Sequence, residues 1–206
     1  ISTAGANRVV SVDLHAAAIQ GFFNIPMDHL TAVPILAGYF KKDRFKNAVI
    51  VSPDTGRTRV AEKYSDILQL PIAVMAKRRK GIGGKQVEPY TIIGNVKGKI
   101  AIVIDDVITS GSVTRQAEML LEAGAKEVYL SSTHPVLASA AIERLQSPMV
   151  KELIVTNTVP VSEDKLMNGK IKVLSIAPLL AGTIQNIHHN KSVSQLFLKD
   201  KIIVPV

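Results

Sequence analysis

The amino-acid sequence predicts an α/β fold with a mainly parallel sheet and helices on both of its faces. Short apolar runs typical of strands alternate with stretches of helical periodicity along the whole chain. Residues 100–104, with the sequence IAIVI, are uniformly apolar and mostly β-branched, which indicates a central parallel strand covered on both faces. Hydrophobic residues make up 47% of the 206 residues, enough to bury a sizeable core in one large α/β unit.

The alternating pattern gives the order of the expected elements. Strands are expected at residues 8–13, 48–51, 72–76, 100–104, 127–131, 153–156 and 171–174. Helices are expected at residues 33–40, 59–68, 113–123, 138–144 and 179–188. The helix at 113–123 is the best defined, because Val113, Ala117, Leu120 and Leu121 recur on one face and Gly124 provides a stop.

Composition narrows the function classes. The absence of Cys excludes a disulfide framework or a thiolate metal site and fits a reducing interior, so we expect a cytoplasmic protein. No apolar run is long enough to span a bilayer, so no membrane partner is expected. The net charge of +8 suits either a nucleic acid or an anionic phosphorylated substrate. Aromatic residues are only 4% and do not alternate with the basic clusters, so we expect no nucleic-acid partner.

The segment after the central strand carries the clearest chemistry. Two carboxylates, Asp105 and Asp106, stand where that strand is expected to end. Small polar residues then lead into the helix at 113–123: Thr109, Ser110, Gly111 and Ser112. Backbone N–H groups at a helix N-terminus favour a phosphate, and the acid pair can accept hydrogen bonds from vicinal hydroxyls or help to hold a divalent cation. The segment therefore predicts a site for a sugar phosphate, ribose 5-phosphate above all; the alternative is a solvated Asp-Asp turn before a capped helix.

Other strands of the expected sheet also end in polar residues. Ligands of such folds bind beyond the carboxyl ends of the strands. His15 follows the first strand, where it is either structural or a ligand of a divalent cation, although Mg²⁺ prefers oxygen. Asp54 follows the second strand in the turn SPDTG and is expected to project from it. Asp-Thr-Gly also occurs in aspartic proteases, but an α/β alternation does not fit that all-β class. His134 follows a later strand and borders either the site or a subunit interface.

The third strand is followed by a basic, glycine-rich stretch. It begins Lys77-Arg78-Arg79-Lys80 and continues with Gly81, Gly83 and Gly84. Such a stretch is either a solvated loop or a cationic flap that closes over a phosphate and neutralises developing charge. The sequence contains neither a G-x-G-x-x-G fingerprint nor a Walker A motif. A bound nucleotide is therefore expected to use neither of those devices.

Taken together, these segments resemble the C-terminal half of a ribose-phosphate pyrophosphokinase, also called phosphoribosyl pyrophosphate synthetase. The matching segments are VDLHAAAIQGFFNIP, VSPDTG, KRR, IIGNVKGKIAIVIDDVITSGS, GAKEVYLSSTHPVL, VTNTVP and SVSQLF. The acid-pair segment alone would indicate only the broader phosphoribosyltransferase class, whereas DLHA, SPD-x-G and KRR in this order are specific to the synthetase. The resemblance implies a type I phosphoribosyltransferase-like fold, with residues 1–206 as the C-terminal domain and the N-terminal half absent. Because the sequence opens on Ile1, we expect the natural start to be missing.

The resemblance also implies a reaction and its participants. The β,γ-diphosphoryl group of ATP would pass to the 1-hydroxyl of ribose 5-phosphate, giving phosphoribosyl pyrophosphate and AMP. Mg²⁺ is the implied cofactor, and a homo-oligomer, often a hexamer regulated by phosphate and ADP, is the implied assembly. The isolated chain is expected to bind ribose 5-phosphate and ATP weakly at best.

Roles are carried over onto matching residues only. Asp105 and Asp106 would hold the ribose hydroxyls, and residues Thr109 to Ser112 would hold the 5-phosphate. His15 would ligate the Mg²⁺ on ATP, and Asp54 a second Mg²⁺ near the diphosphate. Lys77 and Arg79 would stabilise the transferring group.

The sequence departs from the family pattern at several positions, which puts efficiency and regulation in doubt more than fold. These departures are Ala17 and Ala18 after DLHA, Arg57 in place of a second Gly, Lys80 in place of Pro, Val113 in place of Thr, and a longer loop at 77–94. Three alternatives stay open: a salvage phosphoribosyltransferase, a non-catalytic synthetase-associated or regulatory subunit, and a nucleic-acid-binding regulator built on the same fold.

Overall fold

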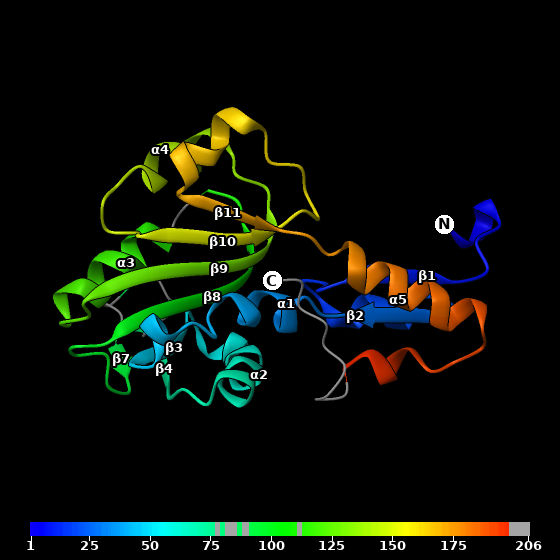
Figure 1. Cartoon of the computed structure of the whole chain (residues 1–206), viewed down its shortest axis with the longest axis horizontal. Coiled ribbons are helices and arrows are strands. Elements are labelled where there is room, and N and C mark those ends of the chain that lie inside the picture. Colours follow the sequence, from blue (N-terminus) through cyan, green and yellow to red (C-terminus); the bar gives the residue numbers. More distant parts are fainter. Residues whose placement is uncertain (77–78, 81–85, 88–90, 111–112, 198–206) are drawn as a thin grey trace.

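A seven-stranded sheet forms the centre of the computed structural model, which describes residues 1–76, 79–80, 86–87, 91–110 and 113–197 (Figure 1). The strand order is β11-β10-β9-β8-β3-β4-β7. All neighbours pair in parallel except β4 and β7, which are antiparallel. The strands are β3 (Ala48–Ser52), β4 (Ile72–Ala76), β7 (Thr91–Ile93), β8 (Ile100–Ile108), β9 (Glu127–Pro135), β10 (Glu152–Thr156) and β11 (Ile171–Leu174).

Helices cover both faces of this sheet, which confirms the predicted fold class. Successive residues of a strand point to opposite faces, so each inner strand contributes to two apolar clusters. One cluster joins Val49, Val51, Ala101 and Val103 to α3 (Val113–Glu122) and α4 (Ser139–Leu145). The other joins Ala48, Ile50, Ile102 and Ile104 to α1 (Val33–Tyr39) and α2 (Thr58–Leu68).

The central strand is longer than predicted. We expected it to end at residue 104, but β8 continues to Ile108, so Asp105 and Asp106 lie inside the strand. The neighbouring β3 pairs with β8 only as far as Val103, whereas β9 continues the ladder as far as the pair Ile108 and Pro135. The extension of β9 thus satisfies the backbone of β8 beyond the end of β3. The acid pair consequently lies where β8 is paired with β9 on one side but no longer with β3 on the other.

The first predicted strand does not belong to the central sheet. It forms β1 (Val9–Val12), which pairs in parallel with β2 (Met27–Leu30), a strand that the sequence pattern did not reveal. Among the described residues, β5 (Arg79–Lys80) and β6 (Gln86–Val87) form a third, two-stranded sheet. The remaining elements are α5 (Ala177–His188) and six 3-10 segments: η1 (Ser2–Ala4), η2 (Ala17–Phe22), η3 (Asp43–Phe45), η4 (Thr55–Arg57), η5 (Glu163–Gly169) and η6 (Val193–Phe197).

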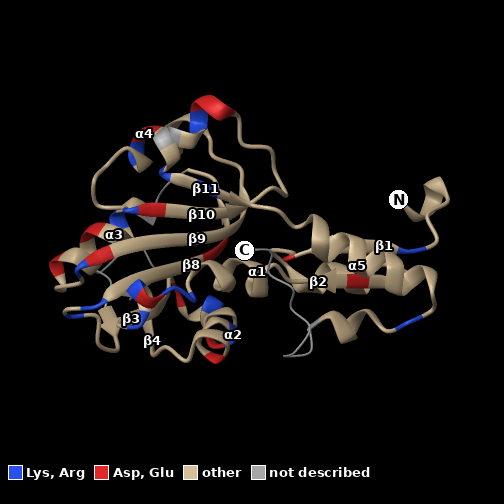
Figure 2. Cartoon of the chain, in the orientation of Figure 1, with Lys and Arg blue, Asp and Glu red and all other residues tan. Residues whose placement is uncertain are grey.

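In Figure 1, β1, β2 and α5 extend away from the central sheet toward the same end of the molecule. Figure 2 shows that this end carries few Lys, Arg, Asp or Glu residues, while charges of both signs are spread over the central sheet and its helices. Val10 of β1 and Ile184 of α5, both at this end, are 37% and 66% exposed. Such an apolar surface is typical of one that another polypeptide segment covers. In the part of the chain that is described, no helix has both the length and the apolar character needed to cross a membrane.

Candidate functional site

The candidate site is built around the acid pair on β8. The backbone N–H of Asp106 donates to Asp105 Oδ1 over 2.9 Å, and the side chains are 25% exposed at Asp105 and 8% at Asp106. Burial raises the pKa of Asp105 to about 7, helped by a side-chain hydrogen bond shared with Asp106 and opposed by the bond from the Asp106 backbone N–H. Burial acts on Asp106 in the same sense, but hydrogen bonds to Asp105 and His15 and the charge of Arg57 outweigh it and lower the Asp106 pKa. Near neutral pH the pair therefore carries between one and two negative charges, with Asp106 the ionised member.

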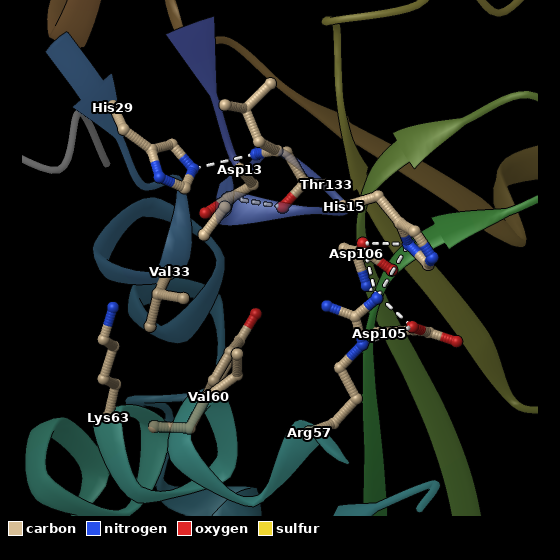
Figure 3. Close-up of a pocket in the computed structure, with 13 residues that line it drawn as sticks. Asp13, His15, His29, Val33, Arg57, Val60, Lys63, Asp105, Asp106 and Thr133 are labelled. Carbon is tan, nitrogen blue, oxygen red and sulfur yellow. Dashed lines mark hydrogen bonds and ion pairs between the residues drawn. The ribbon is translucent and has the colours of Figure 1, made fainter. Parts of the chain in front are cut away.

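Arg57 is the main cationic partner of this pair. Its Nη2 lies 2.6 Å from Asp106 Oδ2, and its Nε lies 3.7 Å from Asp105 Oδ1. Figure 3 shows its guanidinium directed at both carboxylates and at His15. From the sequence, Arg57 was predicted only as a departure from a family pattern and not as a site residue. Its position could have indicated a role in the site, because Arg57 lies in the turn after β3 and the carboxyl ends of parallel strands meet at one edge of the sheet.

His15 reaches the same carboxylates although its strand belongs to another sheet. Its Nδ1 lies 2.8 Å from Asp106 Oδ2 and 2.9 Å from Arg57 Nη2, and its side chain is 74% exposed. The structure therefore brings His15 together with Asp105 and Asp106.

Asp54, the other residue for which we expected a metal role, holds a turn. Its Oδ1 accepts hydrogen bonds from the backbone N–H groups of Gly56, at 2.8 Å, and Arg57, at 3.1 Å, and so caps η4. An Asp at this position satisfies donors that the helical turn leaves free. Through this cap Asp54 fixes the backbone from which the Arg57 side chain projects.

Asp13 anchors the segment that carries His15. Its φ of 41° places it in the left-handed region, and its Oδ2 accepts hydrogen bonds from the backbone N–H of Ala32, at 2.9 Å, and from Thr133 Oγ1, at 2.7 Å. Asp tolerates this backbone conformation better than most residues. The carboxylate thus ties the end of β1 to β9 and to the start of α1.

Two further histidines position the same segment. Nε2 of His134 lies 3.1 Å from the backbone carbonyls of both Val12 and Asp13. Nε2 of His29, on β2, accepts a hydrogen bond from the backbone N–H of Leu14 over 2.8 Å. His134 was expected to border either the site or a subunit interface; in the structure it contacts the segment that carries His15.

The predicted phosphate segment is only partly described. Thr109 and Ser110 follow β8 and are exposed, and α3 begins at Val113. The carbonyl of Ser110 accepts a hydrogen bond from Arg144 Nη1 over 2.7 Å, and that of Thr109 accepts one from the backbone N–H of Ala138 over 2.9 Å. Gly111, Ser112 and Lys77 lie outside the described residues, and Arg79 is placed only as part of β5.

A pocket of about 200 Å³ lies beside the acid pair. Its walls come from the segment after β1, from β2, α1 and α2, and from the ends of β8 and β9. Lys63 of α2 lines it together with Arg57, and Val33 and Val60 supply apolar surface (Figure 3). Acidic acceptors, two cations and apolar walls in one pocket suit part of a polar, anionic small molecule.

These features define a class of protein first: a parallel α/β fold with carboxylates and cations beyond its strand ends, as in enzymes that bind sugar phosphates or nucleotides. Within it, the chain belongs to the phosphoribosyl synthetase-associated domain family, whose profile matches residues 79–198. This confirms the family resemblance predicted from the sequence.

Relatives over almost the whole chain are named ribose-phosphate pyrophosphokinase. The chain is 51% identical over 198 residues to a ribose-phosphate pyrophosphokinase of Bacillus caldolyticus and 49% identical to that of Bacillus subtilis, covering 96% of this chain and 62% of each relative. A crystal structure of phosphoribosylpyrophosphate synthetase from Mycobacterium smegmatis matches with a TM-score of 0.82 and 45% identity, covering 92% of this chain and 61% of that one. The chain therefore spans just under two thirds of the length of these relatives.

Proposed function

We propose that this chain is part of a ribose-phosphate pyrophosphokinase, with residues 1–206 as its C-terminal, phosphoribosyltransferase-like domain. The enzyme would transfer the β,γ-diphosphoryl group of ATP to the 1-hydroxyl of ribose 5-phosphate, giving phosphoribosyl pyrophosphate and AMP. The observation that carries the proposal is an identity of about half over 96% of the chain with relatives of that name. Because the chain spans 62% of those relatives, the activity is proposed for a protein of their length.

Ribose 5-phosphate is assigned to the end of β8. Asp105 and Asp106 would accept hydrogen bonds from the vicinal ribose hydroxyls, which their partial burial would strengthen. The 5-phosphate would lie on residues 109–112, ahead of the N-terminus of α3, where backbone N–H groups favour an anion.

Mg²⁺ is the proposed cofactor, with His15 and Asp54 as ligands. The donor types fit: one imidazole, one carboxylate, and nearby the Oδ1 of Asp106, which is buried and has no hydrogen-bond partner among the described residues. In the described ranges no three His, Asp or Glu side chains gather closely enough to hold a metal by themselves. Substrate phosphates and water would therefore supply the other ligands, as they usually do for Mg²⁺. Bound there, the ion would offset the charge of the phosphates.

Lys77 and Arg79 are proposed as catalytic residues. Diphosphoryl transfer needs little covalent help from the protein and depends on positioning and on neutralising charge at the transferring group. Cations from the stretch after β4 would supply that charge next to the acid pair. A cytoplasmic homo-oligomer, with the hexamer as the first candidate, is proposed on the resemblance to the family and on the absence of Cys.

One observation favours a second candidate. Arg57 occupies the acceptors of the acid pair, which a substrate would need. A non-catalytic, synthetase-associated subunit that keeps the fold is therefore the alternative.

Product analysis separates these candidates. The complete protein, of the relatives' length, is incubated with ATP, ribose 5-phosphate and Mg²⁺, and AMP formation is followed by chromatography. AMP formed in equal amounts with phosphoribosyl pyrophosphate supports the proposal. Pyrophosphate released from phosphoribosyl pyrophosphate and a nucleobase, without AMP, would instead identify a salvage phosphoribosyltransferase. No product from either mixture, together with altered activity of an added synthetase, would favour the associated subunit.

A further inference from the structure

Arg57 is held in place through both its backbone and its guanidinium. Its backbone N–H donates to Asp54 Oδ1, and its side chain, only 18% exposed, ends on Asp106 at 2.6 Å. The guanidinium fork also reaches toward Asp105, so one cation spans both carboxylates. A contact this short between ionised groups in a half-buried place is among the stronger electrostatic interactions available to a protein.

The contact with His15 shows what Arg57 competes for. His15 Nδ1 lies 2.9 Å from Arg57 Nη2 and 2.8 Å from Asp106 Oδ2. A guanidinium only donates hydrogen bonds, so Nδ1 accepts one from Arg57 in the tautomer that carries its proton on Nε2, whereas the tautomer protonated on Nδ1 donates to Asp106 Oδ2 instead. A metal ion bound at Nδ1 would require the same lone pair. A metal bound to Asp106 Oδ2 would likewise use an acceptor that Arg57 holds.

From this geometry we infer that Arg57 is a built-in cation of the acid pair, and that its guanidinium excludes a divalent metal ion from His15 Nδ1 and Asp106 Oδ2. Metal binding at these atoms requires the guanidinium to leave, and Arg57 then sets how tightly the site binds its ion. The inference deepens the proposed function and rests on it, because it concerns the same carboxylates and the same class of cofactor.

Binding of Mn²⁺ alone tests the inference, without ATP or ribose 5-phosphate. The 206-residue chain is titrated with Mn²⁺ at low ionic strength, and free Mn²⁺ is followed by electron paramagnetic resonance. Arg57→Gln removes the charge but keeps a long polar side chain, so it is expected to bind Mn²⁺ about tenfold more tightly or better. Arg57→Lys keeps a charge but loses the planar fork, so its affinity should fall between the two.

Arg59→Gln is the matched control. Arg59 lies two residues further along, is exposed, and forms no ion pair with a described residue. Arg59→Gln removes the same charge from the same region but frees no carboxylate, so it is expected to change the Mn²⁺ affinity much less than Arg57→Gln does. An equal gain in both glutamine variants would show a general effect of net charge and would overturn the inference.

Thermal unfolding gives a second readout. Without metal, Arg57→Gln should unfold at a lower temperature than the parent, because a buried carboxylate loses its partner. With the same excess of Mn²⁺ its midpoint should rise more than that of the parent, since stabilisation by a ligand grows with the logarithm of its concentration divided by Kd. If Arg57→Gln does not fold, Arg57→Lys decides the question. Folded variants with unchanged or weaker Mn²⁺ affinity would overturn the inference.

A separate assay distinguishes this inference from the proposed function. The complete protein, of the relatives' length, is incubated with ATP, ribose 5-phosphate and Mg²⁺, and AMP formation is followed. If no AMP forms while Arg57→Gln still binds Mn²⁺ more tightly, the proposed function is wrong and the competition at the acid pair stands.

Discussion

Replacing Asp105 by Asn is expected to change how the stability of the chain depends on pH. Burial, with the side-chain hydrogen bond shared with Asp106, raises the Asp105 pKa from 3.8 to about 7, so the folded state disfavours the ionised carboxylate. The stability that Asp105 contributes is therefore fully present below its unfolded pKa, near 4, and is lost as the pH rises through about 7. The Asn variant has no such titration and should not lose this contribution.

The magnitude follows from the two pKa values. A difference of about three between folded and unfolded states corresponds to about 4 kcal/mol, at about 1.4 kcal/mol for each tenfold change in proton affinity. Asp105 and Asp106 share a hydrogen bond and titrate together, so part of this free energy belongs to the pair rather than to Asp105. We therefore expect the single substitution to recover about 2 kcal/mol at alkaline pH.

Urea unfolding followed by circular dichroism measures the effect, at about pH 4.5 and about pH 8. Relative to the parent, the unfolding free energy of Asp105→Asn should rise by about 2 kcal/mol between these conditions. Asp66→Asn serves as control, because Asp66 lies exposed on α2, away from the acid pair. A stability difference between Asp105→Asn and the parent that does not change with pH would refute the reasoning.

The remaining predictions concern the metal, the basic stretch and the segment after β1. Chelation of divalent ions should abolish AMP formation by the complete enzyme, and full activity in excess chelator would contradict the proposed cofactor. Arg79→Ala should lower the rate of AMP formation on the order of 10³-fold, because a cation on the transferring group is lost; a rate within about threefold of the parent would remove Arg79 from the mechanism. Asp13→Ala should destabilise the fold by about 2 kcal/mol in urea, since the N–H of Ala32 and the hydroxyl of Thr133 lose their acceptor. Asp13→Asn keeps one acceptor oxygen and should cost less; equal losses would contradict the hydrogen-bond explanation.

Most strands of the central sheet could be predicted from the sequence, because a strand or helix is marked by the hydrophobic pattern of its own residues. The expected strand at 72–76 coincides with β4, and the expected helix at 113–123 with α3, which ends one residue earlier. The length of β8 was not predictable in this way. Asp105 and Asp106 interrupt the apolar run, and only the pairing with β9, set by residues about 30 positions away, keeps the backbone extended.

Several residues of the candidate site were predicted from the sequence, but the contacts between them were not. The sequence marked His15 and the acid pair separately, and the fold brings them within hydrogen-bond distance. Arg57 could not be assigned to them, because its partners lie 42 residues before it and 49 residues after it, at Asp106. Nothing in a single sequence states that such a cation turns toward the sheet rather than toward solvent.

The roles of Asp54 and Arg57 are linked through one turn. From the sequence, Asp54 was expected to ligate a metal ion, and Arg57 was expected to disturb the same turn. In the structure Asp54 Oδ1 holds the N–H of Arg57, and Arg57 in turn covers the acid pair. A cation drawn to Asp54 Oδ1 would compete with that hydrogen bond, while a cation drawn to Asp106 would compete with the guanidinium. Both events loosen Arg57, so metal binding at either carboxylate should favour binding at the other.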